Sequence, residues 1–359
     1  MSRKSARANF PPDVKKALAE RVAYHCSFPQ CSAATIGPSG EHLKASSKSG
    51  RACHIASAAL GKGACRRVPT MHVDERKLID NGIWMCATHA DVIDGDETRF
   101  TIEMLKTWRR IAETRARIEH ELGVTLTSSE WRWTDEQLAK HEFSLVGDGE
   151  ENVTIGTALD DCCVSTLWGR GVASAVRDFL IEFTRNAFAH GGATSVAVEI
   201  HPTNTIRISD NGAPFDIQRL LQTEAKSGGV LSFCALHRLS EKHVTVLSRR
   251  LGNRNECTIA VVRSKEDLLT ATPCALSLTR EEVRGGRVRL DSVLISSCGT
   301  VYLILPEFFT ISDIAQLRHA KSELLGDKRV VLVGSDLSDT VWERLVDVLP
   351  GCELMQLKD

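Results

Sequence analysis

Two short groups of polar residues have the types and spacing of a nucleotide site. Glu182 and Asn186 are four positions apart, so a helix would place both on one face. Asn186 offers an oxygen suited to a Mg²⁺ that bridges phosphates, and Glu182 can take a proton from an attacking water. Asp210 can accept a hydrogen bond from the amine of adenine, and Gly212 lets a ligand approach the backbone. These four residues predict binding of ATP together with Mg²⁺.

A helix and two strands must position these residues. The runs Thr194–Ile200 and Thr205–Ser209 are rich in β-branched residues, and the turn His201–Asn204 separates them. This pattern predicts two adjacent strands, the second of which ends at Asp210. We therefore expect a helix face with a carboxylate and an amide, packed on a sheet whose turn carries an aspartate.

A second group of residues has the spacing of a metal site. Cys26 and Cys31 form a Cys-x4-Cys pair, and Cys86 and His89 form a Cys-x2-His pair. Each pair can bind a metal from a single turn, and three cysteines with one histidine suit a tetrahedral structural Zn²⁺. The alternative is a set of buried, reduced cysteines. Zinc is favoured because paired cysteines at this spacing seldom arise from packing alone.

Two further motifs lie between the paired ligands: Ala52-Cys53-His54-Ile55 and Asn81-Gly-Ile-Trp-Met-Cys86. Together with the ligand pairs they resemble the zinc-containing HNH (ββα-metal) endonucleases, over roughly Val14–Trp108. The resemblance implies that His54 is a general base that activates water for attack on a phosphodiester. It also implies that Asn81 holds the loop that orients this base.

Two departures from the nuclease pattern leave two functions open. In many such nucleases an acidic residue before the base and a histidine after the last zinc ligand bind the catalytic metal. The corresponding residues in this chain are Cys53 and Ala90. Asp94 lies one helical turn beyond Ala90 and can supply the missing carboxylate, whereas Asp91 is a poorer substitute. The module is therefore either an active nuclease or a metal-stabilised relic that only binds nucleic acid.

The residues of the nucleotide site belong to a longer ordered series of motifs. In chain order these are Glu182-x-x-x-Asn186-Ala, Gly192-Ala-Thr-Ser-Val, Ile208-Ser-Asp210-Asn-Gly212, Lys226-Ser-Gly228-Gly229 and Cys298-Gly299-Thr300. The series resembles the GHKL ATPases, which include gyrase B, the heat-shock chaperones, the sensor histidine kinases and MutL. The resemblance implies that Gly228 and Gly229 end the ATP lid and that Thr300 contacts the nucleotide, with Thr258 as the less favoured candidate. Some members carry an aspartate where this chain has Ala189.

The formal net charge of −1 hides an uneven distribution. Residues 1–70 contain twelve Lys or Arg and three Asp or Glu, whereas acidic residues are in excess after residue 125. A basic front end indicates a nucleic-acid-binding face, with a solvated basic tail as the alternative. We expect DNA rather than RNA as the partner.

Taken together, these elements predict an α+β multidomain protein. Four parts are expected in chain order: a zinc-bound ββα-metal HNH-like module with a trailing helix Thr101–Leu122 (residues 1–125), a linker (126–160), a central Bergerat-type GHKL α/β sandwich (161–306) and a small C-terminal α/β segment (307–359). In the last part, the periodicity predicts two helix–strand units, Ile311–Leu325 with Arg329–Val333 and Ser338–Leu349 with Glu353–Leu357.

The two resemblances imply an ATP-regulated, metal-dependent DNA endonuclease, and analogy suggests a role in bacterial genome defence. The alternative function is an ATP-binding sensor or switch whose degenerate HNH-like module grips nucleic acid or a partner without cutting it. Because GHKL proteins often close as dimers, the resemblance also implies a homodimer.

The composition favours a protein of a reducing compartment. No apolar run approaches the roughly 20 residues that a membrane helix needs, so no membrane partner is expected. The polar start Met1–Arg7 does not resemble a secretory signal, and we expect a cytoplasmic protein. The twelve cysteines are accordingly expected as reduced thiols or metal ligands, and not as disulfides.

Overall fold

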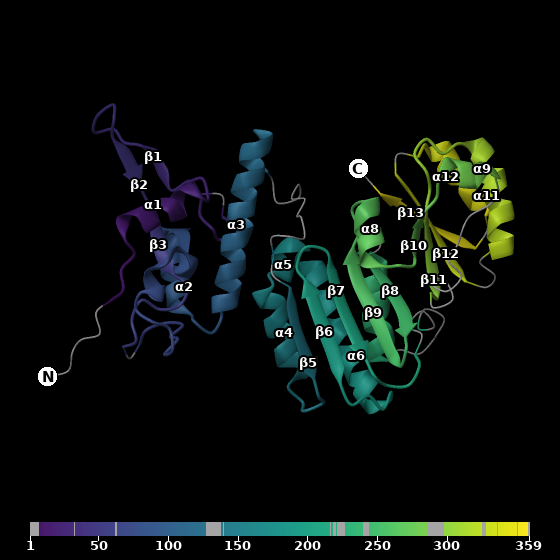
Figure 1. Cartoon of the computed structure of the whole chain (residues 1–359), viewed down its shortest axis with the longest axis horizontal. Coiled ribbons are helices and arrows are strands. Elements are labelled where there is room, and N and C mark those ends of the chain that lie inside the picture. Colours follow the sequence, from purple (N-terminus) through teal and green to yellow (C-terminus); the bar gives the residue numbers. More distant parts are fainter. Residues whose placement is uncertain are drawn as a thin grey trace. The chain divides into compact units, whose positions relative to one another are not determined.

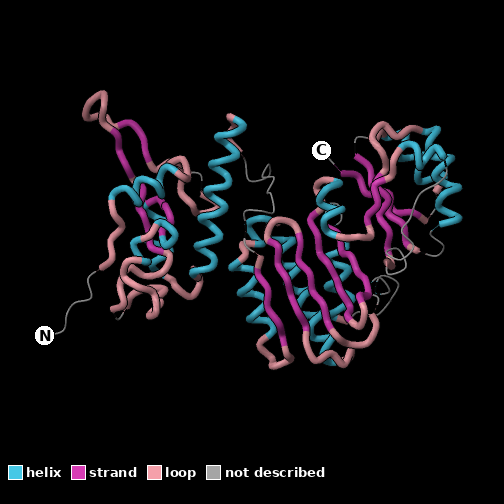
Figure 2. Tube along the Cα trace, in the orientation of Figure 1, coloured by secondary structure: helices cyan, strands magenta, loops and turns pink. Residues whose placement is uncertain are grey.

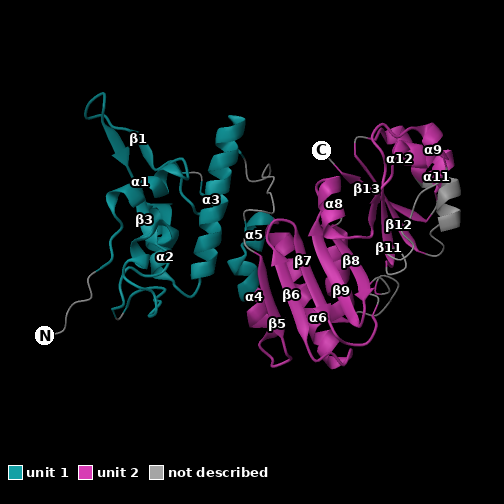
Figure 3. Ribbon diagram, viewed as in Figure 1, with its two compact units in different colours: residues 1–139, 157–167 teal, residues 140–156, 168–359 magenta. Residues whose placement is uncertain are grey.

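The computed structural model describes residues 7–31, 33–61, 63–126, 138, 140–215, 217, 220, 227–239, 244–285, 298–324, 328–335, 337–349 and 351–357. The chain forms two compact units, which Figure 3 colours separately. Unit 1 comprises residues 1–139 and 157–167, and unit 2 comprises residues 140–156 and 168–359. Helix α4 (Glu151–Asp161) contributes residues to both units.

Unit 1 combines short strands with helices. Its elements are α1 (Pro12–Glu20), β1 (Ile36–Pro38), β2 (Ser46–Lys48), β3 (Gly50–His54), β4 (Gly82–Cys86), α2 (Ala87–Gly95), α3 (Ile102–Leu122) and α5 (Val164–Leu167), with 3-10 turns at Glu75–Lys77 and Ile79–Asn81. Strand β1 pairs with β2, and β3 pairs with β4, both in antiparallel fashion. Because α2 begins directly after β4, the segment from β3 to α2 has a ββα arrangement (Figure 1).

Helix α3 shows how local sequence determines an element of this unit. The side chain of Thr101 caps its N-terminus by accepting the N–H of Met104 at 3.1 Å. Gly123 ends it in the left-handed conformation, with a φ of 67°. The buried face of the helix includes Trp108, which lies in the core of the unit. The predicted helix Thr101–Leu122 is confirmed.

Unit 2 contains a five-stranded antiparallel sheet in the order β5-β6-β7-β9-β8 (Figures 1 and 2). Its strands are β5 (His141–Leu145), β6 (Val196–His201), β7 (Thr205–Asp210), β8 (Val244–Leu251) and β9 (Arg254–Val261). Helices α6 (Arg170–Ala189) and α7 (Gly228–His237) pack against each other, with the rings of Phe179 and Phe233 6.2 Å apart. The two predicted strands before Asp210 are confirmed as β6 and β7. Strand β5 lies within the stretch expected as a linker, whose residues 127–137 are outside the described part.

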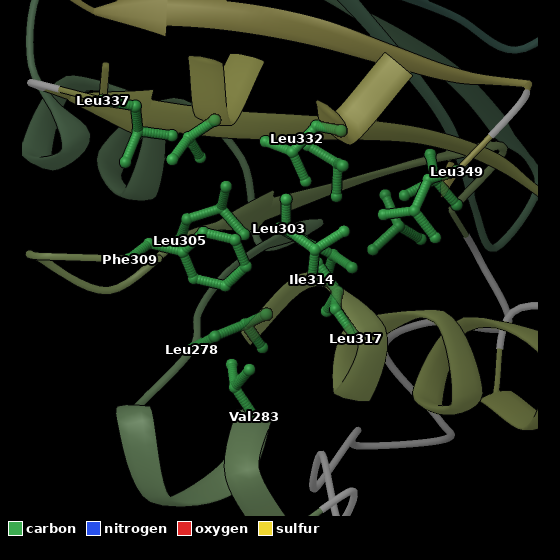
Figure 4. Close-up of a cluster of buried hydrophobic side chains, with 14 of the residues drawn as sticks. Leu278, Val283, Leu303, Leu305, Phe309, Ile314, Leu317, Leu332, Leu337 and Leu349 are labelled. Atoms are coloured by element: carbon green, nitrogen blue, oxygen red, sulfur yellow. The ribbon is translucent and has the colours of Figure 1, made fainter. Parts of the chain in front are cut away.

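A second, parallel sheet completes unit 2, in the order β10-β11-β12-β13. Its strands are β10 (Ala275–Ser277), β11 (Thr300–Ile304), β12 (Arg329–Ser335) and β13 (Cys352–Leu357), and the helices of this part are α8 (Lys265–Ala271), α9 (Arg280–Gly285), α11 (Ile311–Leu324) and α12 (Asp339–Val348). Figure 4 shows its core, in which Leu303, Ile314 and Leu332 belong to one buried cluster. The two helix–strand units predicted at the C-terminal end are confirmed.

The start of this second sheet corrects two expectations. Strands β10 and β11 belong to it, so the boundary predicted at residue 306 cuts through the sheet. Cys274 and Cys298 form a disulfide, with their Cα atoms 5.9 Å apart. They meet because each lies just before one of two neighbouring strands, β10 and β11. The expectation that no cysteine forms a disulfide is wrong for this pair.

The two sheets of unit 2 share buried side chains. Leu247 and Ala260 of the five-stranded sheet lie in one cluster with Tyr302 and Val331 of the parallel sheet. This mixed α/β architecture with several sheets agrees with the expected α+β multidomain class. In the described part of the chain, no helix combines the length and apolar character that crossing a membrane requires.

Candidate metal centre and nucleotide site

The four predicted metal ligands come together in unit 1. Cys26 and Cys31 lie in the loop after α1, Cys86 ends β4, and His89 lies in the first turn of α2. Their ligand atoms all lie within 4.8 Å of one another. Nδ1 of His89 is 3.2 Å from Sγ of Cys86 and 3.6 Å from Sγ of Cys26. The cluster can therefore hold a metal ion, and its three sulfurs and one nitrogen are compatible with Zn²⁺.

The surroundings of this cluster fit a cation. Burial raises the pKa of the Cys26 thiol to about 12, so without a cation the thiol stays protonated at neutral pH. A bound Zn²⁺ deprotonates its thiol ligands, and the N–H of Cys86, 3.3 Å from Sγ of Cys26, would stabilise the thiolate. His89 stacks on Phe28 with ring centroids 4.0 Å apart, which fixes the imidazole beside the sulfurs.

His54 ends β3 and is oriented by two neighbours. Its Nε2 lies 2.8 Å from the carbonyl oxygen of Ala8, and its ring stacks on Phe10 with centroids 3.9 Å apart. Because a carbonyl oxygen only accepts, Nε2 carries the proton and Nδ1 keeps its lone pair. Burial lowers the pKa of the imidazole, which keeps the ring neutral at pH 7. His54 thus has a nitrogen that can accept a proton, as a general base requires.

Asn81 holds the segment that follows His54. Its Oδ1 accepts the N–H of Ala56 at 2.7 Å, and its Nδ2 donates to the carbonyl oxygens of Ala56 and Arg76 at 2.9 and 3.1 Å. Its own backbone oxygen accepts the N–H of Ile55 at 2.9 Å. The structure places Asn81 on the loop beside His54, where the sequence expected it, and its role in catalysis stays a prediction.

Arg66 is a buried residue that sequence analysis did not single out. Only 3% of its side chain is exposed. Its guanidinium donates to the backbone oxygens of Ile55 at 2.8 Å and His54 at 3.3 Å, and also to that of Ile93. It further donates to the carboxylate of Asp94 at 2.7 Å. Arg66 therefore joins the end of β3 to α2, and no local pattern reveals it because its partners lie 11 to 28 positions away.

The ligands predicted for a catalytic metal near His54 are engaged elsewhere. Asp94 is paired with Arg66, whose positive charge opposes a nearby cation, and Asp91 is paired with an arginine of β3. Burial raises the pKa of the Cys53 thiol to about 12, so this residue stays neutral, and Ala90 offers no ligand atom. Among the described residues, the zinc-type cluster is the one group of three or more His, Cys, Asp or Glu side chains arranged to hold a metal.

In unit 2, the N-terminus of α7 meets the face of α6 that carries the predicted pair. A Cβ atom on Gly228 would overlap the carboxylate of Glu182, and one on Gly229 would lie 2.5 Å from Nδ2 of Asn186. The backbone of α7 thus approaches the polar ends of both side chains closely. The structure therefore brings Gly228 and Gly229 together with Glu182 and Asn186. The positive end of the α7 dipole also lies beside the carboxylate of Glu182.

Asp210 ends β7 and is 3% exposed. Its Oδ1 accepts the N–H of Gly212 at 2.7 Å and an N–H of Asn255 at 3.0 Å. Its Oδ2 lies 3.2 Å from the same Asn255 nitrogen and retains capacity to accept a further donor. A Cβ atom on Gly212 would lie 2.7 Å from the backbone oxygen of Gly191, so glycine is required at this turn.

Asn255 is a candidate functional residue that sequence analysis missed. It lies opposite Asp210 in the register between β7 and β9. Its Oδ1 accepts from Arg250 at 2.6 Å and from the N–H of Phe215 at 3.1 Å, and its Nδ2 also donates to the carbonyl of Ala213 at 2.8 Å. The only sequence signal is an asparagine just after a turn, and its importance depends on the pairing of β7 with β9.

A cavity of about 340 Å³ lies between α6, α7 and the end of β7. Its polar lining includes Asn186, Asp210, Gly229 and Asn255. Apolar side chains form much of the remaining wall, among them Phe179, Phe183, Ile217 and Val230. An apolar cavity with a few convergent polar groups is the usual form of a small-molecule site.

Thr300 does not lie with these residues. It begins β11, where it is paired with Arg329 in the parallel sheet, and it does not line the cavity. Thr258, the other candidate, faces Arg207 in β7 and does not line the cavity either. The structure corrects the expectation for Thr300, because the strand next to Asp210 is β9 and not β11.

Both sites have to be interpreted from their own geometry. No family model matches the chain, and neither the curated proteins nor the solved structures include a significant match.

Proposed function

We propose that unit 2 binds an adenine nucleotide in the cavity beside Asp210, and that the zinc-stabilised front module of unit 1 binds nucleic acid under the control of that nucleotide. The observation that carries the proposal is the buried carboxylate of Asp210, oriented by two donors at a largely apolar cavity. Burying a carboxylate is costly unless its acceptors are used. An amine of adenine that donates to Oδ2 would complete its hydrogen bonding.

The remaining residues of the cavity have complementary roles in this proposal, which agrees with the resemblance to GHKL ATPases. Apolar side chains such as Val230 would pack against the base. Asn186 is exposed, so its side-chain oxygen is accessible to a Mg²⁺ that bridges phosphates. Glu182 is 27% exposed and lies beside the start of α7, where it could accept a proton from water during ATP hydrolysis.

Titration calorimetry with a non-hydrolysable ATP analogue and Mg²⁺ tests the nucleotide site. Asp210→Asn should weaken binding roughly ten- to a hundredfold, since the charged acceptor is lost. Glu182→Ala should keep the affinity but slow hydrolysis by roughly 10²–10⁴-fold, since only the proton acceptor is removed. Asp339→Asn, at an exposed position of α12, is the matched control. Unchanged affinity in Asp210→Asn would refute this nucleotide site.

A second candidate function is metal-dependent DNA cleavage, which the unprotonated Nδ1 of His54 favours. In this function ATP would regulate the nuclease, and His54 would activate water. The pairing of Asp94 with Arg66 argues for the non-cleaving alternative, because it leaves the catalytic metal without a carboxylate ligand. The front module would then grip nucleic acid through its basic residues alone.

A plasmid-nicking assay with Mg²⁺ or Mn²⁺, with and without ATP, separates the two candidates. If the module cuts, His54→Ala should lower the rate roughly 10²–10⁴-fold while zinc content and DNA affinity stay unchanged. Asp94→Asn should then lower the cleavage rate only if the Asp94 carboxylate moves away from Arg66 and binds the catalytic metal. Salt-sensitive binding without cleavage under any condition would remove the nuclease and leave the binding function.

A further inference from the structure

The β1–β2 hairpin of unit 1 takes part in neither site. Its strands pair in the register Ile36 with Lys48, Gly37 with Ser47 and Pro38 with Ser46. Every residue from 40 to 44 is exposed, and Leu43 at the tip has a relative exposure of 107%. Figure 1 shows the hairpin extending away from the other elements of the front module. The hairpin therefore presents one large apolar side chain to solvent at its tip.

The base of the hairpin is fixed. Thr35 is buried, its Oγ1 donates to the carbonyl of Tyr24 at 2.5 Å, and the same oxygen accepts from Nε1 of Trp84 at 2.8 Å. A Cβ atom on Gly50 would overlap the Trp84 ring, so the chain just after the hairpin packs closely against the indole. An isolated two-stranded hairpin is only marginally stable in water. These contacts therefore hold the exposed tip in a defined direction.

The chemistry of the tip fits a groove of a nucleic-acid duplex. Leu43 is followed by Lys44, and Lys48 lies in β2, with all three residues exposed. The two-stranded ribbon carries small residues such as Gly37 and Ser47. Proteins that bind the minor groove use apolar side chains, leucine among them, to wedge between base steps. Lysines near such a wedge would meet the phosphates.

We propose that the β1–β2 hairpin enters a groove of duplex DNA, where Leu43 inserts between two base pairs while Lys44 and Lys48 contact the flanking phosphates. This inference rests on the proposed binding of nucleic acid by unit 1 and assigns the element that makes the contact. A membrane surface fits less well, because interfacial anchoring needs a broad apolar face and Leu43 is the one large apolar side chain between residues 39 and 45.

Full-length, zinc-loaded protein and a duplex that carries 2-aminopurine at successive positions provide the test. Leu43→Ala should weaken duplex binding about tenfold and abolish the fluorescence increase that unstacking causes. The double variant Lys44→Ala/Lys48→Ala should lower the slope of log affinity against log salt by about two, while the fluorescence increase persists at saturation. Leu122→Ala, which changes a leucine that is 65% exposed at the end of α3, is the matched control.

The possible outcomes separate this inference from the function on which it rests. Unchanged duplex affinity and fluorescence in Leu43→Ala would overturn the wedge and leave nucleic-acid binding by unit 1 intact. If Leu43→Ala lost as much affinity for single strands as for duplexes, the wedge would be overturned in favour of simple stacking on exposed bases. If Leu43→Ala lost binding to anionic phospholipid vesicles but kept its DNA affinity, the hairpin would be assigned to a membrane. Failure of the wild-type protein to bind any nucleic acid would remove both proposals together.

Discussion

The two units hold their key carboxylates in different ways. In unit 1, Asp94 is paired with the cationic side chain of Arg66, which is buried and also bonded to backbone oxygens. In unit 2, Asp210 is oriented by the neutral amide of Asn255 and remains at the edge of a cavity. A cation neutralises a carboxylate, whereas an amide only orients it. The first arrangement therefore serves the fold, and the second keeps a charged acceptor available for a ligand.

Loss of the metal should have the largest effect, and only on unit 1. Cys86→Ser should reduce zinc from about one per chain to near zero and unfold the front module, since binding at such sites contributes roughly 10–16 kcal/mol of folding free energy. Elemental analysis and the near-UV circular dichroism of the tryptophans would measure this. Nucleotide binding by unit 2 should persist, and Cys352→Ser in β13 is the control. Stoichiometric zinc in a Cys26→Ser/Cys86→Ser variant would contradict the ligand assignment.

Replacement of Arg66 should have the second-largest effect, and this effect should also be confined to unit 1. Arg66→Leu leaves the buried carbonyl oxygens of Ile55 and Ile93 without this donor. Each unsatisfied buried acceptor costs about 1–3 kcal/mol, so the free energy of unfolding of unit 1 should fall by about 3 kcal/mol. Urea denaturation followed by tryptophan fluorescence measures the change. Arg67→Leu, at the exposed neighbouring position, should leave the midpoint nearly unchanged.

Asn255→Ala should have a smaller effect on stability but a direct effect on the ligand. Removal of the amide frees the carboxylate of Asp210 and leaves the Ala213 carbonyl without its donor. We expect about 2 kcal/mol of destabilisation in unit 2 and about tenfold weaker nucleotide binding. Asn253→Ala, in the exposed β8–β9 turn, is the control. A nucleotide affinity that responds to Arg66→Leu and not to Asn255→Ala would reverse the comparison between the two units.

The smallest expected effect is the pH dependence of the His54 contribution. Burial lowers the pKa of His54 in the folded module, so protons bind more readily to the unfolded chain. Its contribution to stability is therefore complete above about pH 6.5 and is lost as the pH falls toward the lowered folded-state pKa. Between about pH 7.5 and 5.5, the wild type should lose more stability than His54→Gln, measured by urea denaturation. Protonation of the zinc ligands affects both proteins alike, and equal losses would show that His54 does not titrate as its burial implies.

Local signals account for what the sequence predicted correctly. The caps Thr101 and Gly123 delimit α3 because they satisfy the helix ends directly. The spacing of the Cys26 and Cys86 pairs places each pair in a single turn, and the fold then only has to bring two turns together. Glu182 and Gly228 lie 46 positions apart, and their close approach is a finding of the structure that no local signal predicted.

Contacts between distant segments account for what the sequence did not reveal. The motif at Thr300 resembled a last strand that contacts the nucleotide, but Thr300 begins β11 of the parallel sheet, and the pairing of strands depends on the whole sheet. The partners of the Arg66 side chain come from two separate segments, the end of β3 and α2, so no spacing rule identifies it. The Cys274 disulfide likewise follows from the adjacency of β10 and β11, which composition does not report.

The disulfide and the metal cluster place opposite demands on the redox state of one chain. Cys274 and Cys298 must be oxidised to stay joined, whereas Cys31 and Cys86 must be reduced to bind Zn²⁺. The sulfurs of the disulfide belong to buried residues, whereas Cys31 and Cys86 are half-buried. A mild reductant would therefore keep these two metal ligands reduced before it cleaved the disulfide. Handling of the purified protein has to preserve both states, and excess thiol or strong oxidant would each damage a different unit.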